Sequence, residues 1–137
     1  MTSARNQLKG KVVSVQEGAV NAIVDLETEG GETITATITL DAVKELGLAP
    51  GKAVTAVIKA TEVMIGLGEL KLSVRNKLPG EVVSVEEGAV NAVVTLKTNG
   101  GSTVVATISM AAVKELGLAP GVKAEALVKA TSVMVAV

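Results

Sequence analysis

The 137-residue sequence contains no cysteine, no histidine and no aromatic residue. Without cysteine or histidine it cannot form disulfides, and it lacks the usual zinc ligands and the usual nucleophile–base pairs of enzymes. We therefore expect no enzyme activity and no site for a bare metal cation. The carboxylates are scattered along the chain, as solvated charges on strand faces and turns usually are.

The lack of aromatic rings also disfavours single-stranded nucleic acid and pterins as ligands, because both are commonly held by stacking. The net charge of −1 argues against a groove for a polyanion. No apolar run approaches the roughly 20 residues of a membrane span, and no signal peptide is apparent. We expect a cytoplasmic protein without membrane or nucleic-acid partners, and with no cofactor.

The sequence does contain an internal repeat. The segment from Ser3 recurs from Ser73 at an unbroken offset, and about 40 of roughly 64 aligned positions are identical. Two copies of this length predict two similar small domains, at residues 1–67 and 73–137, joined by a short linker at residues 68–72. The stretch 66–72 that joins the units is too short for a free tether and too apolar for a solvated one, so we expect the domains to pack tightly.

Each repeat is small, and a core of this size supplies only about 3–5 kcal/mol of stability. Disulfides and zinc are excluded, and the sequence is 48% hydrophobic. We therefore expect a homo-oligomer.

The pattern within a repeat is mostly that of short strands. Period-two alternation, β-branched residues and glycine turns predict strands at 7–15, 19–26, 33–40, 54–60 and 63–67, with a bulge or bend at Gly10. A helical segment at 41–46 follows Thr39 or Asp41 as N-cap and ends at Gly47. The prediction is an all-β protein with one short helix per unit, built as two tandem OB-like five-stranded antiparallel barrels.

Candidate binding residues are those whose side chains donate hydrogen bonds. The only two arginines, Arg5 and Arg75, occupy the same place in the repeated motif, where a guanidinium fork suits an oxyanion. The alternative is a surface arginine kept by duplication, although positions 9, 11, 52 and 55 have diverged in charge or polarity between the repeats while the arginine has not. The motifs are Ser3, Ala4, Arg5 and Asn6, and Ser73, Val74, Arg75 and Asn76.

Three further groups recur. In the first group, a lysine and a threonine share one strand face, where they either contact an anion or protect a sheet edge from aggregation. The two segments are Lys59, Ala60 and Thr61, and Lys129, Ala130 and Thr131. Thr39 and Ser109 precede the helices, as N-caps, as anion contacts or as both. Glycine turns with an asparagine form either plain turns or anion concavities; these are Gly18, Ala19, Val20 and Asn21, and Gly88, Ala89, Val90 and Asn91.

With these motifs, both repeats resemble Mop domains, the molybdate-binding modules of bacterial molybdenum-handling proteins, over nearly the whole chain. The resemblance to di-Mop proteins implies a cytoplasmic homotrimer that stores molybdate or tungstate between subunits. It implies one type of site at Ser3, Arg5, Thr39, Lys59 and Thr61 and their counterparts in the second repeat, and another near the three-fold axis at the glycine turns. Val74 replaces the usual alanine and adds bulk beside Arg75, whereas Thr61 and Thr131 keep the hydroxyl of the usual serine.

Two alternatives remain open at this level. Similar pairs of modules sense ligand within molybdate-responsive regulators or transporters, although this sequence carries no DNA-binding or ATPase part. A repeat protein, natural or engineered, could also be a structural scaffold whose donors bind nothing.

Overall fold

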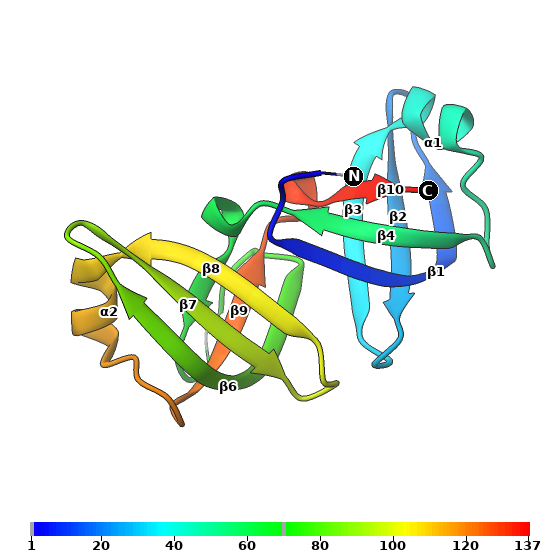
Figure 1. The fold of residues 1–137 in the computed structure, drawn as a ribbon. Coiled ribbons are helices and arrows are strands. Elements are labelled where there is room, and N and C mark those ends of the chain that lie inside the picture. The colour runs from blue at the N-terminus through cyan, green and yellow to red at the C-terminus, as the bar shows by residue number, and fades with distance from the viewer. Residues whose placement is uncertain (1, 70) are drawn as a thin grey trace.

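The computed structural model describes residues 2–69 and 71–137, and contains two curled five-stranded antiparallel sheets that lie side by side (Figure 1). Met1, in the first predicted domain, and Leu70, in the predicted linker, lie outside the described residues. The first repeat forms β1 (Asn6–Glu17), β2 (Asn21–Thr28), β3 (Thr33–Thr39), α1 (Leu40–Leu46), β4 (Ala53–Ile58), the 3-10 turn η1 (Ala60–Glu62) and β5 (Met64–Gly66). The second forms β6 (Asn76–Glu87), β7 (Asn91–Thr98), β8 (Thr103–Ser109), α2 (Met110–Leu116), β9 (Lys123–Val128), η2 (Ala130–Ser132) and β10 (Met134–Ala136).

The predicted all-β class, with one short helix in each repeat, is confirmed. The helices are capped as expected, because the Thr39 hydroxyl accepts a hydrogen bond from Ala42 N at 3.1 Å. Gly47, with φ of 63°, ends α1 in the left-handed conformation that glycine adopts without steric cost. Asp41 lies inside the helix rather than at its cap.

Gly10 is the site of a close approach, whereas the register shift of β1 falls between Val12 and Ser14. A Cβ at Gly10 would collide with the main chain of Glu27 on β2. The strand can therefore cross β2 closely there because residue 10 has no side chain. The bulge expected at Gly10 is two or three residues further along.

The last strand of each repeat is exchanged between the sheets. The strand orders are β10-β4-β1-β2-β3 and β5-β9-β6-β7-β8, so β10 of the second repeat pairs with β4 of the first. Reciprocally, β5 pairs with β9. Figure 1 shows the red end of the chain returning beside the green β4 and close to the N-terminus. The division into domains at 1–67 and 73–137 remains a prediction about the sequence, since each sheet in space draws on both repeats.

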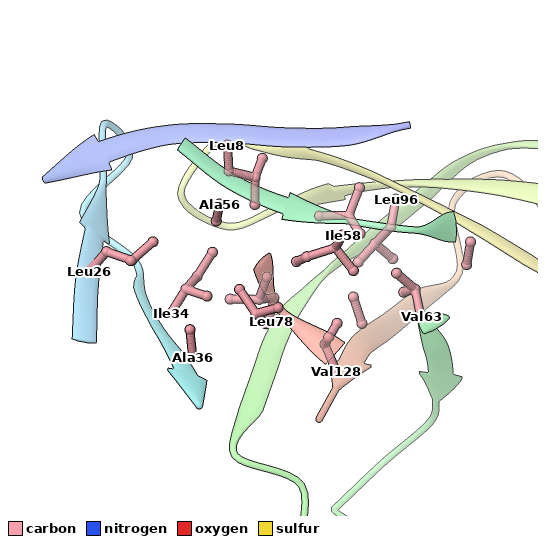
Figure 2. Packing of buried hydrophobic residues seen from close by; sticks show 14 of the residues in the cluster. Leu8, Leu26, Ile34, Ala36, Ala56, Ile58, Val63, Leu78, Leu96 and Val128 are labelled. Carbon is pink, nitrogen blue, oxygen red and sulfur yellow. The ribbon is translucent and has the colours of Figure 1, made fainter. Parts of the chain in front are cut away.

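One hydrophobic core joins the two sheets. Its buried side chains come from both repeats, and Figure 2 shows Ile34 and Leu78 within the same packed cluster. Each fully buried valine, leucine or isoleucine contributes roughly 1.5–3 kcal/mol. The tight packing expected from the short linker is confirmed, and the shared core supplies part of the stability that we had expected from an oligomer.

Candidate anion-binding site

The arginine and lysine motifs of one repeat meet at one end of its sheet. β1 and β4 pair with Asn6 opposite Ile58, so Arg5, just before β1, and Lys59, just after β4, lie at the same end of the two strands. Both side chains are exposed. The same register, Asn76 opposite Val128, places Arg75 beside Lys129.

These four cationic side chains are unpaired. Within residues 2–69 and 71–137, the side chains of Arg5, Arg75, Lys59 and Lys129 make no ion pair and no hydrogen bond. Two neighbouring cationic side chains without an acidic partner produce a positive potential, which attracts an anion. Their arrangement therefore leaves each guanidinium and ammonium group available to an external ligand.

The turn after each lysine adds further donors. Lys59 precedes η1, and no side chain caps the first turn of η1, so its leading main-chain N–H groups lack a side-chain acceptor. Thr61 is exposed on this turn. Its neighbour Glu62 directs its carboxylate to the hydroxyl of Ser132 in the other repeat, at 3.1 Å. The second repeat has the same uncapped turn with Thr131 exposed.

The structure separates Thr39 from Arg5 of its own repeat. Thr39 lies opposite Asn21, and the β2 residue after Asn21 pairs with Glu17, so Thr39 lies at the end of β1 far from Arg5. In contrast, η1 of the first repeat packs against β8 of the second, and β8 ends at Ser109. Within one chain, the cap hydroxyl on the strand beside the Arg5 group is therefore that of Ser109. By the same exchange η2 packs against β3, which ends at Thr39.

The cap hydroxyls keep a donor. Thr39 and Ser109 accept from the helix N–H groups of Ala42 and Ala112, at 3.1 and 3.0 Å. A hydroxyl that accepts through its oxygen can still donate its proton. The two alternatives stated for these residues, cap and anion contact, are thus chemically compatible.

The glycine turns form a second group of candidate residues. Each turn joins the first two strands of its repeat, at the end of the first strand far from the arginine. Gly18 N donates to Asn21 O at 2.8 Å, and Leu40 N donates to Val20 O at 2.8 Å, so the turn is fastened to the start of α1. The second repeat repeats both bonds at Gly88 and Met110. Ala19 and Ala89 are exposed, and Val20 and Val90 are 72% and 74% exposed, which is unusual for valine.

Asn6 and Asn76 differ from the other polar candidate residues because they are buried, with 1% and 2% exposure. Each carboxamide bonds to the main chain of a residue in the other repeat, Val105 for Asn6 and Thr35 for Asn76. Ala4 and Val74 beside the arginines are half-buried, while Ser3 and Ser73 are exposed. Ala60 and Ala130 are buried and anchor their turns.

Sequence reasoning missed the partners of these asparagines. A signal was available, since Asn6 shares with Leu8 the period-two face that points inward. An inward polar residue retained in both repeats predicts a specific buried partner. The missing information was which strand supplies that partner.

Among the described residues, no helix is long and apolar enough to cross a membrane, and no cluster of three acidic or other metal-ligating residues occurs.

Comparison with known proteins finds similarity over nearly the whole chain. A TOBE domain model matches residues 2–65 and again 72–135. The molybdenum transport protein ModE of Azotobacter vinelandii is 42% identical over 137 residues, which cover 99% of this chain and 51% of ModE. The molybdenum-pterin-binding protein MopA of Rhodobacter capsulatus is also 42% identical, with 98% of this chain and 52% of MopA covered. This chain thus spans about half the length of these relatives.

A solved structure is similar along its full length. It is that of ModG, described as a cytoplasmic molybdate-binding protein and determined with molybdate bound. The two structures superpose with a TM-score of 0.97 at 46% identity, over 99% of this chain and 98% of ModG.

Proposed function

The chain belongs to the TOBE-domain family through both of its repeats, and we propose that it binds molybdate or tungstate without covalent chemistry. One observation carries this proposal. The only two arginines lie beside Lys59 and Lys129, and none of these four side chains makes a hydrogen bond or an ion pair within the described part of the chain. ModG, which matches this chain over its full length, is described as binding molybdate, and MopA, about half of which this chain matches, is named for binding molybdenum-pterin.

The donor set fits a tetrahedral dianion. A guanidinium offers a planar fork of N–H groups, and the ammonium, the threonine hydroxyl and the uncapped N–H groups of the turn add donors from other directions. Charge-assisted hydrogen bonds of this kind are about twice as strong as neutral ones. A bare cation would instead require carboxylate, thiolate or imidazole ligands.

We place the protein in the cytoplasm by likeness to ModG, which is described as a cytoplasmic molybdate-binding protein, and we propose that it stores molybdate or tungstate there. A homotrimer would bring the exposed Val13, Val20, Val83 and Val90 against neighbouring copies, because apolar side chains exposed in both repeats favour an interface. The second type of site, at the glycine turns, would lie in the same assembly. Ligand sensing within a regulator or transporter is a weaker proposal, since this chain spans only about half of the molybdenum transport protein ModE.

The name of MopA raises a molybdenum-pterin as an alternative ligand. The sequence offers no aromatic ring on which a pterin could stack. The cationic and hydroxyl side chains of the candidate site can bind the oxyanion part of such a ligand without its pterin. We therefore propose the free oxyanion as the ligand.

Equilibrium dialysis against molybdate, followed by elemental analysis, tests the function. The wild-type chain should retain molybdenum, and the double variant Arg5→Ala with Arg75→Ala should retain at least tenfold less at the same free concentration, a loss of about 1.4 kcal/mol per site or more. The matched control removes two other exposed, repeated cations, Lys44→Ala with Lys114→Ala, and should bind as wild type. Full retention by the arginine variant would contradict the proposal, and retention by none of the proteins would favour an inert scaffold.

A further inference from the structure

Asn6 and Asn76 carry a reciprocal link between the repeats. Asn6 Nδ2 donates to Val105 O at 2.8 Å, and Val105 N donates to Asn6 Oδ1 at 2.7 Å. Asn76 makes the same pair of bonds to Thr35, at 2.8 and 2.7 Å. One carboxamide thus pairs with both main-chain groups of a residue on β8 or β3, as a neighbouring strand would.

This arrangement leaves the carboxamides unavailable to a ligand. Both are buried, and the main-chain groups they contact lie on the outermost strands of their sheets, β3 and β8. No buried side-chain polar atom in the described residues lacks a partner, so the pairs satisfy all four side-chain atoms. A motif residue next to each arginine is therefore directed away from the solvent.

Each link joins two parts of the candidate site that come from different repeats. Asn6 directly follows Arg5, and Val105 lies four residues before Ser109 on β8, about 13 Å at the ~3.3 Å rise of an extended strand. The link therefore fixes the main chain at Arg5 relative to the strand that ends at the Ser109 hydroxyl. Asn76 does the same for Arg75 and the strand that ends at Thr39.

We propose that Asn6 and Asn76 are positioning residues that act across the repeats, each holding its neighbouring arginine against the strand that carries the other repeat's cap hydroxyl. The proposal rests on the proposed oxyanion function and refines it. It removes the two asparagines from the set of direct ligands. It also implies that the affinity of the Arg5 group for the anion depends on the Asn6 link alone, and that of the Arg75 group on the Asn76 link alone.

Isothermal titration with molybdate in two single-arginine backgrounds tests this crosswise dependence. Arg75→Ala retains only the Arg5 group, and Arg5→Ala retains only the Arg75 group. Asn6→Asp is added to each, because aspartate keeps the acceptor for Val105 N but loses the donor to Val105 O. In the Arg75→Ala background it should weaken binding about tenfold, because the main chain at Arg5 is then held less firmly against β8. In the Arg5→Ala background binding should change less than about twofold, and Asn76→Asp should show the opposite pattern.

A uniform effect would overturn the proposal. If Asn6→Asp weakens binding equally in both backgrounds, or in neither while circular dichroism shows a native fold, the asparagines do not position individual arginines. If the aspartate variants do not fold, Val105→Pro decides, because proline removes the N–H group that donates to Asn6 Oδ1 and is tolerated on an outermost strand. It should reproduce the crosswise loss, and a wild-type titration in the Arg75→Ala background would overturn the proposal. An error in the proposed oxyanion function would give a different result, because the double variant Arg5→Ala with Arg75→Ala would then bind molybdate as the wild type does.

Discussion

Asn6 and Val105, which are 99 residues apart in the chain, exchange two hydrogen bonds in the shared core of the two repeats. Thr35 and Asn76 form the equivalent contact from the opposite direction. Together with the exchanged strands β5 and β10, these contacts make the two repeats one structural unit. The stability of the chain should therefore respond to changes at the contacts between repeats.

Replacing Asn6 by alanine should be strongly destabilising. The variant leaves Val105 N and Val105 O without their partner in a buried region, at about 1–3 kcal/mol for each unpaired group. We expect the free energy of unfolding to fall by about 2–4 kcal/mol in guanidinium titrations. Asn99→Ala, at an exposed turn, should change it by less than about 0.5 kcal/mol. Equal effects of the two substitutions would show that the link contributes nothing.

The hairpin tips of the two repeats also meet. A Cβ at Gly30 would collide with the carbonyl of Gly100, so Gly30→Ala should force the β2–β3 and β7–β8 turns apart. We expect a loss of about 1–3 kcal/mol, as for other overpacked sites, measured as a lower midpoint of thermal unfolding. Glu29→Ala changes the neighbouring exposed residue and should leave the midpoint nearly unchanged. A midpoint for Gly30→Ala equal to that of Glu29→Ala would refute the close contact.

Strand exchange should keep the repeats together after the chain is cut. A protease site placed within residues 68–72 would separate the repeats covalently, while β5 and β10 would still pair with the opposite sheets. We expect both fragments to elute together in size-exclusion chromatography and to separate only in denaturant. Separation under native conditions would contradict the exchange and the shared core.

Assembly should depend on the exposed turn valines. Val20→Ser with Val90→Ser removes apolar surface without touching the core, since both side chains are largely exposed. Light scattering should give three times the 13.8 kDa chain mass for the wild type and a lower average mass for the variant at the same dilution. The matched control, Glu17→Ser with Glu87→Ser, should keep the wild-type mass. A wild-type mass of one chain would refute the trimer.

Much of the fold could be predicted from the sequence, because strand periodicity, glycine turns and the Thr39 and Ser109 caps are local signals. Strand exchange could not. Val63–Met64 and Val133–Met134 lie in nearly identical local sequences, so nothing nearby determines whether each pairs with its own sheet or the other. That choice depends on contacts between the repeats, which are distant in the sequence.

In the candidate site, too, some features could be predicted from local sequence and others depend on contacts between the repeats. Arginine and lysine could be identified by residue type, and strand register places Arg5 beside Lys59 as the repeated motifs suggested. The grouping of Thr39 with Arg5 came from the resemblance, and within one chain the two residues lie at opposite ends of β1. The buried role of Asn6 depends on a contact with the other repeat, which no local pattern records.

The most direct test of the account is a crystal structure of the protein grown with tungstate, in which anomalous scattering locates tungsten. We expect the oxygens of one tungstate to lie within hydrogen-bonding distance of the Arg5 and Lys59 side chains, and those of another to lie within that distance of the Arg75 and Lys129 side chains. A fully loaded crystal with no tungsten at either pair of cations would contradict it.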